Sequence, residues 1–171
     1  MNEKYELTEE FEEIETWRKG WLQKIKVYRI RALRAFADVK IGDLGGFVET
    51  KQNLSNMGNA WVYDNAEVYD NAEVYGNAEV CGDAKVCDNA NIFWCSSIGS
   101  RHATTTMFRN KDNGITVTCG CFMGTLEEFA ARVEKEHGEN IFGKEYKLLI
   151  ELAKIHFGLQ DETKGEEENG I

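Results

Sequence analysis

A six-residue repeat runs from Asn59 to Ile92 and constrains the fold more than any other feature of the 171-residue chain. Its units read NAWVYD, NAEVYD, NAEVYG, NAEVCG, DAKVCD and NANIFW. One column is alanine, and a second column two positions later is valine or isoleucine: Ala60, Ala66, Ala72, Ala78, Ala84, Ala90, then Val62, Val68, Val74, Val80, Val86, Ile92. A period of six fits neither a 3.6-residue helix nor a simple hairpin, but it fits a solenoid with flat sides.

Both columns are expected to face the interior, because positions two apart in an extended chain point the same way. Asn, Asp and Gly residues lie between each Val and the next Ala, where they predict corners with positive φ. The alternative is a sandwich of ordinary short strands. Sandwich strands do not keep a six-residue spacing over six units, so the solenoid is preferred.

The hexads resemble those of hexapeptide-repeat proteins with a left-handed β-helix, whose units read aliphatic, x, x, x, small, x. The segment VYDNAE, beginning at Val62, fits that pattern. The resemblance implies that three hexads form one triangular coil, that residues 18 apart stack, and that coils assemble as a homotrimer or a multiple of it. The position after the aliphatic residue departs from the acyltransferases of that family and predicts a packing or interface ladder: Tyr63, Tyr69, Tyr75, Cys81, Cys87, Phe93.

The expected fold is therefore mainly β: a short left-handed β-helix with an N-terminal basic strand cap and a C-terminal α+β cap. An acidic segment is expected over residues 1–21, the strand cap and β-helix over 22–100, a hairpin plus two helices over 101–157, and a disordered acidic tail over 158–171. Asn113-Gly114 predicts a hairpin turn. Thr125 to Glu128 reads as a capping box that opens the first helix, and the second helix is expected over residues 143–157.

The charge distribution is uneven. A net charge of −10 argues against extended binding to DNA or RNA, because neutralisation of phosphates drives such binding. Residues 1–16 are strongly acidic, whereas the next segment contains Lys24, Lys26, Arg29 and Arg31. These cations either pair with the acidic segment and solvate an edge strand, or grip the phosphates of a small ligand.

Targeting and redox signals are consistent with one another. The sequence has no signal-peptide pattern and no apolar stretch long enough to span a membrane. Its five cysteines are an odd number, which favours a reducing compartment over a disulfide framework. We therefore expect a cytoplasmic protein.

The order of motifs RIRALRAF, GDLGGFVE, the hexads, IGSRHATTTMF, CGCF, GTLEEF and KIHF is similar to that of a family of proteins encoded by phages and prophages. The resemblance covers roughly residues 22–157. It implies a location in the cytoplasm of a bacterial host and the role of an accessory factor acting against host defence.

The leading functional expectation is a non-catalytic protein that binds and sequesters a small anionic ligand, such as a nucleotide signal of host immunity, between subunits. Hydroxyls, a histidine and arginines suit the phosphates and ribose of a nucleotide. The expected ligand-binding residues lie on the basic strand and just after the repeat: Arg29, Arg31, Arg101, His102, Thr104, Thr105, Arg109.

Other functions remain open at this stage. The second hypothesis is a protein–protein inhibitor or scaffold that acts through the repeat surface, with a host defence protein as one candidate partner. The third is acyl transfer with His102 as general base. Cys119-Gly120-Cys121 is too closely spaced for an ordinary zinc pair and reads as buried thiols, so no metal and no cofactor is expected.

Overall fold

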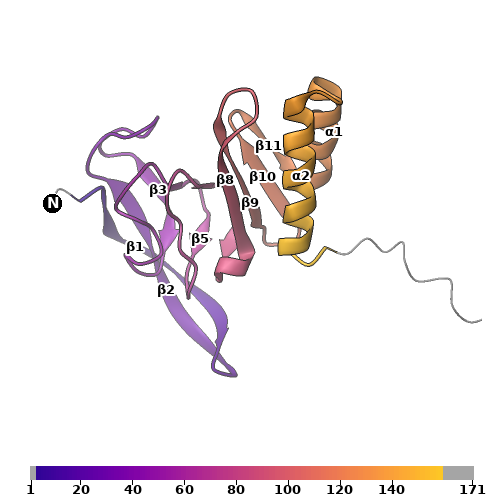
Figure 1. The fold of residues 1–171 in the computed structure, drawn as a ribbon. Helices are drawn as coiled ribbons and strands as arrows, with labels where there is room; N and C mark the ends of the chain where they lie inside the picture. Colours follow the sequence, from indigo (N-terminus) through magenta and orange to yellow (C-terminus); the bar gives the residue numbers. More distant parts are fainter. Residues whose placement is uncertain (1–2, 160–171) are drawn as a thin grey trace, which may run out of the picture.

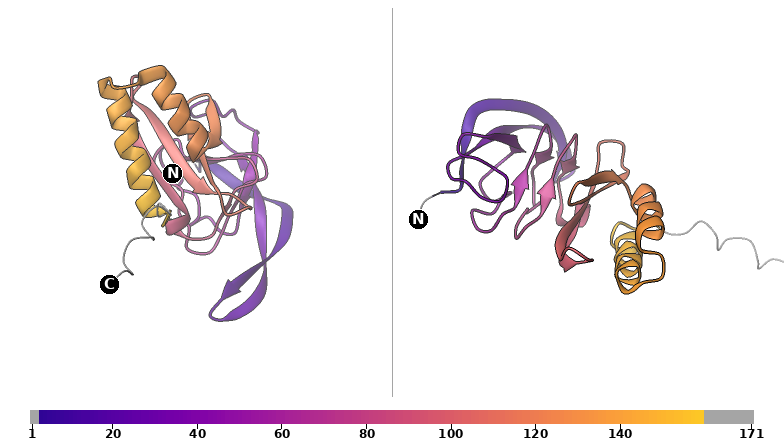
Figure 2. Two further views of the ribbon diagram at one scale, coloured as in Figure 1. Left: turned by 90° about the vertical axis from the view of Figure 1, so that its right-hand side faces the viewer. Right: turned by 90° about the horizontal axis from the view of Figure 1, so that it is seen from above.

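The structure is a computed structural model that describes residues 3–159. The hexad repeat and a long hairpin lie on one side of a four-stranded sheet, and two helices lie on its other side (Figure 1, Figure 2). The elements, in chain order, are β1 (Tyr5–Arg18), β2 (Trp21–Ala32), β3 (Leu44–Val48), β4 (Trp61–Val62), β5 (Glu67–Val68), β6 (Glu79–Val80), β7 (Lys85–Val86), η1 (Asn89–Asn91), β8 (Ile92–Ile98), β9 (Ala103–Arg109), β10 (Ile115–Cys119), β11 (Phe122–Thr125), α1 (Leu126–His137) and α2 (Ile141–His156).

The hexad repeat places successive units in parallel register. Trp61 of β4 lies beside Glu79 of β6, and Val68 of β5 lies beside Val86 of β7, so residues 18 positions apart are neighbours. Each paired stretch is only two residues long, because the chain turns within every hexad. The residues at these turns have positive φ, which confirms the predicted corners: Asp64, Asp70, Gly76, Gly82.

The inward columns are confirmed with one exception. Every Val or Ile of the repeat is buried, and so is every Ala up to Ala84. Ala90 is exposed, and its prediction is wrong. The last hexad forms the 3₁₀ turn η1 instead of a flat side, because the Asp88 side chain accepts a hydrogen bond from the Ala90 N–H and caps the turn.

The predicted fold class, a short left-handed β-helix between two caps, is wrong: the chain is a mixed α/β protein with three small sheets. A mixed five-stranded sheet has the order β1-β2-β3-β5-β7, an antiparallel sheet has the order β11-β10-β9-β8, and β4 and β6 form a parallel pair. None of these sheets closes or continues as a regular solenoid within residues 3–159. The repeat contributes strands of only two residues each, and most strand residues belong to antiparallel hairpins instead.

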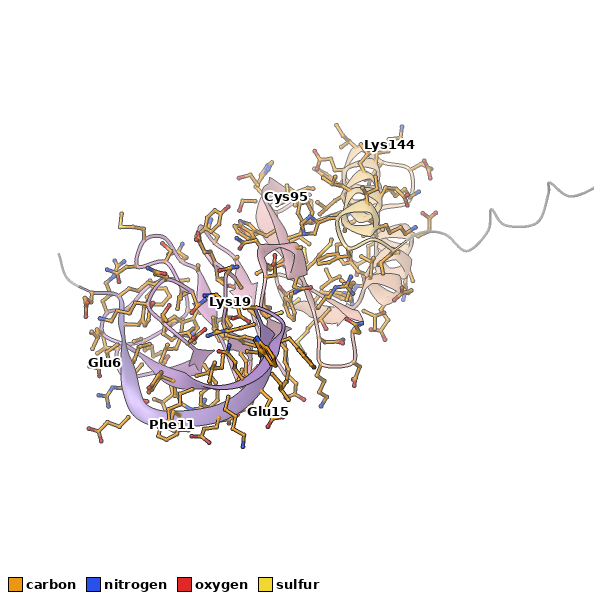
Figure 3. All side chains as sticks on the ribbon, turned by 90° about the horizontal axis from the view of Figure 1, so that it is seen from below. Glu6, Phe11, Glu15, Lys19, Cys95 and Lys144 are labelled. Atoms are coloured by element: carbon orange, nitrogen blue, oxygen red, sulfur yellow. The ribbon has the colours of Figure 1, made fainter. Side chains whose placement is uncertain are left out.

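Most of the acidic N-terminal segment forms β1, and β1 pairs with the basic strand β2. Glu13 lies opposite Lys26 and Glu15 opposite Lys24, so unlike charges face each other across the strands. In Figure 3 the hairpin curves along the repeat, with Glu6, Phe11 and Glu15 spaced along β1. The basic strand therefore pairs with the acidic segment, which was one of the two alternatives that the sequence left open.

The inner face of this hairpin covers part of the expected aromatic ladder. Val27 of β2 packs with Phe47 and Tyr69 in a small buried cluster, and only 8% of Tyr69 is exposed. Tyr75 stays 52% exposed and makes an edge contact with Trp94, at 4.4 Å between ring centroids. The ladder thus contributes mainly to internal packing, and Tyr75 is its most exposed residue.

Two glycines of β3 allow the backbone to approach the repeat closely. A Cβ on Gly45 would lie 2.5 Å from the Val62 carbonyl oxygen, and one on Gly46 would lie 2.5 Å from that of Ala66. Both distances are shorter than any real Cβ contact. These glycines therefore serve close packing within a strand.

The C-terminal part follows the predicted pattern more closely. β9 and β10 form a hairpin whose Asn113 has a φ of 66°. Thr125 and Glu128 form the expected capping box of α1, and Gly138 ends it. The strands β8 and β11 were missed. They complete the sheet on either side of the predicted hairpin, and α1 and α2 lie side by side over one face of it (Figure 2).

The four-stranded sheet separates two hydrophobic cores. Phe108 of β9 packs with the valines of the repeat, whereas its neighbour Met107 packs with the helices. Alternation along one strand therefore serves both cores. Among residues 3–159, neither helix is long and apolar enough to cross a membrane. The predicted disordered tail, apart from its first residues, lies outside the described residues.

Candidate functional site

One pocket of about 170 Å³ opens at the edge where the four-stranded sheet meets both helices. We call it the Arg101 pocket. It is bounded by the β8–β9 turn, the β10–β11 turn, one face of α1 and one residue of α2: Ser100, Arg101, Ala103, Cys119, Gly120, Cys121, Phe122, Phe129, Arg132, Val133, Glu136, His137, Tyr146. The pocket combines an apolar wall of Phe and Val side chains with cationic and hydroxyl groups, as small-molecule sites usually do.

The β8–β9 turn is held against α2 by two contacts. The backbone N–H of Gly99 donates a 3.0 Å hydrogen bond to Oε2 of Glu145. Gly99 also has a φ of +71°, and a Cβ there would lie 1.9 Å from the Tyr146 hydroxyl oxygen. Only glycine leaves room for that hydroxyl, so Gly99 fixes Arg101 and Tyr146 on the same side of the pocket.

Cys119 and Tyr146 form the polar floor. The Thr105 hydroxyl lies 3.2 Å from Cys119 Sγ, and the Tyr146 hydroxyl lies 3.7 Å from the same sulfur. Burial raises the pKa of Tyr146, the hydrogen bond with Cys119 raises it further, and the charge of Arg101 offsets only part of the rise. The Tyr146 hydroxyl therefore stays protonated near neutral pH and can donate a hydrogen bond.

Basic side chains surround the opening of the Arg101 pocket. Arg101 is exposed and makes no salt bridge with any residue that the structure describes. Arg132 of α1 pairs with Glu136 one turn later, at 2.5 Å between Nε and Oε1, so its charge is largely balanced within the helix. His137 follows Glu136 and lies 5.7 Å from Tyr146 between ring centroids. Arg101 is thus the cation with the least internal compensation here.

The predicted ligand residues of the basic strand lie elsewhere and are engaged. The Arg29 guanidinium donates to Glu10, to the carbonyl of Gly45 and to that of Asp64, and it stacks 4.1 Å from the Phe47 ring centroid. Arg31 pairs with Glu6. Both arginines hold the hairpin together, on a different sheet from Arg101.

The predicted residues after the repeat separate along β9. Thr105 reaches the pocket floor through Cys119, whereas the Thr104 hydroxyl lies 2.9 Å from that of Ser96 at the surface. His102 is exposed in the tight turn, with a φ of 49°.

Arg109 is bound at the far end of β9, where it donates to the carbonyl oxygens of Asn113 and Phe157 at 3.1 and 2.6 Å. Of the seven predicted residues, only Arg101 lines the pocket, and Thr105 is buried behind it in contact with Cys119.

The pocket residues that sequence reasoning missed come from the helices. Arg132 lies on the flank of α1, and Tyr146 occupies an inward position of α2 that reads as core packing. Their convergence with Arg101 depends on how α1 and α2 dock on the sheet. The one local signal was the position of Arg101 in a short Gly- and Ser-containing segment that reads as a loop, since binding residues often lie on loops.

Among the described residues, no group of three or more His, Cys, Asp or Glu side chains could hold a metal ion. Within residues 3–159, His102 makes no hydrogen bond or ion pair with a carboxylate through its ring, and it is not among the residues that line the Arg101 pocket.

No protein-family model matches the chain, and no curated protein matches it significantly.

Proposed function

We propose that this protein is a non-catalytic binding protein that holds a small anionic group in the Arg101 pocket. The observation that carries this proposal is the placement of an uncompensated guanidinium, that of Arg101, beside the protonated hydroxyl of Tyr146. An arginine fork and a neutral donor together suit a phosphate or a carboxylate. The apolar wall formed by Phe122, Phe129 and Val133 would shield the pair from water and strengthen it.

The size of the pocket limits what it can enclose. About 170 Å³ admits a phosphate or a carboxylate with a few attached atoms, but it is smaller than the sites that enclose drug-sized ligands. A nucleotide could place one phosphate in the pocket and leave its base and ribose outside. The anionic group is therefore the recognised part, whether it is free or the end of a larger molecule.

A wider depression of about 450 Å³ fits an anion less well. It is lined by Glu73, Tyr75, Asn89, Ile92, Phe93, Trp94 and His156, with no arginine or lysine. Its one carboxylate would repel an anionic ligand. The charge of the lining residues thus favours the smaller Arg101 pocket.

Sequestration is the form of binding that we propose, because the pocket groups suit holding an anion more than transforming it. The resemblance to phage-encoded proteins suggests a biological context, removal of a host signal that carries a phosphate. In that context the ligand would be released chemically unchanged when the protein is denatured.

Titration calorimetry with inorganic phosphate, adenosine monophosphate, cyclic nucleotides and small carboxylates tests the proposal. Binding of at least one of these should weaken about 10- to 100-fold in Arg101→Ala, corresponding to about 1.5–3 kcal/mol for a charge-assisted hydrogen bond. Arg31→Ala is the matched control, because it removes the same side chain from the distant hairpin. Loss of binding in Arg31→Ala with retention in Arg101→Ala, or no binding of any of these anions, would refute the Arg101 pocket.

A second candidate function is binding to a protein partner, and one observation favours it. Around the turn between β1 and β2, Trp17 and Trp21 are 72% and 73% exposed and Leu22 is 52% exposed. We call these three residues the hairpin tip. Exposed tryptophans gathered at one point are typical of contact surfaces on soluble proteins.

Crosslinking in bacterial cells that express the protein tests this second candidate. A partner that binds the hairpin tip should crosslink to the wild type and to Arg101→Ala, but not to a Trp17→Ser/Trp21→Ser variant. If the double variant retains every crosslinked protein, the hairpin tip is not a binding surface.

A further inference from the structure

Helix α2 is apolar on two opposite faces. Its inner face packs on the sheet and on α1 through Tyr146, Leu149, Ile150 and Ala153. Its outer face exposes Ile141, Leu148, Leu152 and Ile155 by 68%, 72%, 50% and 77%. We call these four outer residues the α2 stripe. A surface helix normally has one apolar stripe, and a second one indicates that this face is covered in the working molecule.

Helix α1 provides an internal comparison. It lies beside α2 over the same face of the sheet (Figure 2), so both helices have the same kind of environment. The exposed positions of α1 are mainly charged, including Glu127, Arg132, Glu134 and Lys135. The apolar outer face of α2 is therefore specific to that helix and is not a general property of this layer.

The spacing of the α2 stripe indicates what kind of element covers it. Ile141, Leu148, Leu152 and Ile155 are separated by seven, four and three residues along α2. Alternating steps of three and four residues form the seam along which two helices pack side by side. The element that fits this stripe is another helix.

The residues that follow Leu159 in the sequence are poorly suited to cover the α2 stripe. After Leu159 the sequence contains only one further large aliphatic residue, Ile171, among mostly polar and acidic residues. A second molecule can supply the apolar surface that these residues lack.

We infer that the α2 stripe packs against the α2 stripe of a second copy of this chain, as an antiparallel pair of helices related by a twofold axis. A twofold contact joins the same surface on both copies, so one stripe is sufficient to form it. The charges at the edges of the stripe support the antiparallel direction. Lys144 and Glu151 lie on one edge, and an antiparallel pair brings Lys144 of each copy toward Glu151 of the other.

The position of the stripe also permits such a contact. In Figure 3 Lys144 lies on the outer side of the helical layer, away from the hairpin and the repeat. The 16 residues of α2 span about 24 Å, enough for several layers of side-chain packing. One helix per copy buries less area than a standard protein interface, so the dimer should be weak and concentration-dependent. This surface differs from the repeat surface on which a trimer was expected.

Sedimentation velocity across micromolar to submillimolar concentrations tests the inference. The wild type should shift from monomer to dimer, and Leu148→Glu should weaken the dimer about tenfold or more. Ala131→Glu is the matched control, because it places the same side chain at an exposed position of α1, and it should leave the dimer unchanged. Unchanged circular dichroism would show that both variants are folded. A wild type that stays monomeric throughout, or a Leu148→Glu variant that dimerises normally, overturns the inference.

Charge reversal tests the direction of the pair. Lys144→Glu and Glu151→Lys should each weaken the dimer several-fold, since each places like charges opposite each other. The double variant should recover most of the wild-type affinity, because it restores unlike pairs. If the double variant is weaker than both single variants, the antiparallel arrangement is wrong.

Discussion

The ammonium group of Lys4 donates a 2.8 Å hydrogen bond to the carbonyl oxygen of Ala60, at a place where neither residue has any exposed surface. The ring of Phe36 lies 5.1 Å from the same ammonium. Lys4 is the one basic residue among residues 1–16, and its hydrogen bond joins the N-terminal segment to the first hexad. A lysine in such a place makes the stability of the fold depend on pH.

Burial, and to a lesser extent the nearby charge of Arg34, lowers the pKa of Lys4 from 10.5 to about 8. Between these two pH values the unfolded chain binds more protons at Lys4 than the folded chain does. The contribution of Lys4 to the free energy of unfolding should therefore rise with pH across this interval, by up to about 3 kcal/mol. Urea denaturation at several pH values from 7 to 10.5 measures the rise.

The control for Lys4 is Lys4→Met, which keeps the length of the side chain and removes the titration. Tyr69 and Cys81 have pKa values raised to about 12 and 11, mainly by burial, and they make the fold less stable as pH rises. The difference between wild type and Lys4→Met removes these shared effects. A difference that stays constant between pH 8 and 10.5 would contradict the assignment to Lys4.

Val74→Asp should unfold the repeat or destabilise it by several kcal/mol, because the Val74 side chain is fully buried and a carboxylate there has no partner. Glu73→Lys, at the adjacent exposed position, should be nearly neutral. Thermal denaturation of the two variants measures the difference. Similar melting temperatures would mean that the inward register of the repeat is wrong.

Gly99→Ala should destabilise the protein more than Gly82→Ala. Both glycines have positive φ, so both substitutions carry a backbone cost of about 1–2 kcal/mol. Only at Gly99 would the new Cβ collide with Tyr146, since nothing lies within 4 Å of one at Gly82. The excess loss of stability in denaturant measures how firmly the Arg101 pocket is held. Equal losses would show that Tyr146 moves aside freely.

Arg18→Ala should release the hairpin tip from the repeat. The Arg18 guanidinium pairs with both Glu49 and Asp70 while about a quarter of its side chain is exposed. We expect a loss of about 1–3 kcal/mol and faster amide hydrogen exchange in β1 and β2. Lys24→Ala, which removes a well-exposed and longer salt bridge to Glu15, is the control and should change little. If exchange in the hairpin is unchanged in Arg18→Ala, the hairpin is held by its apolar contacts alone.

The ion pairs of Arg18 with Glu49 and Asp70 also predict how the stability of the fold responds to acid. Burial alone would raise the pKa of Glu49, but hydrogen bonds from Arg18 and from the Asp70 N–H outweigh it and lower that pKa. A carboxyl with a lowered pKa stabilises the fold above its ordinary pKa, and this contribution is lost as the pH falls through the folded value. Arg18→Ala should therefore flatten part of the acid-side loss of stability, as measured by denaturation between neutral pH and the onset of acid unfolding.

Local patterns in the sequence predicted local structure well. The spacing of two between Ala66 and Val68 identified buried positions, Asn113 identified a turn, and the capping box at Thr125 identified a helix start. Each of these depends on residues within a few positions of one another. The same reasoning failed at Ala90, where a side-chain cap from Asp88 competes with the repeat.

Contacts between distant segments could not be predicted in the same way. The repeat pattern was extended to a whole fold class, but the long β1–β2 hairpin and the strands β8 and β11 place most strand residues in antiparallel sheets. The sequence left open whether Arg29 pairs with the acidic segment or binds a ligand, and it did not identify the partner, Glu10, 19 positions earlier. Arg101 and Tyr146 meet only because α2 docks beside the β8–β9 turn, and no spacing in the sequence records that contact.

The alternation of Met107 and Phe108 along β9 has a consequence for the accuracy of folding. One side chain fills the core of the helices and the next fills the core of the repeat. A slip of one residue in the pairing of β9 would exchange the two faces and leave both cores wrongly filled at once. Both cores therefore select the same register of β9, because a misaligned register loses the packing of both cores and not of one alone.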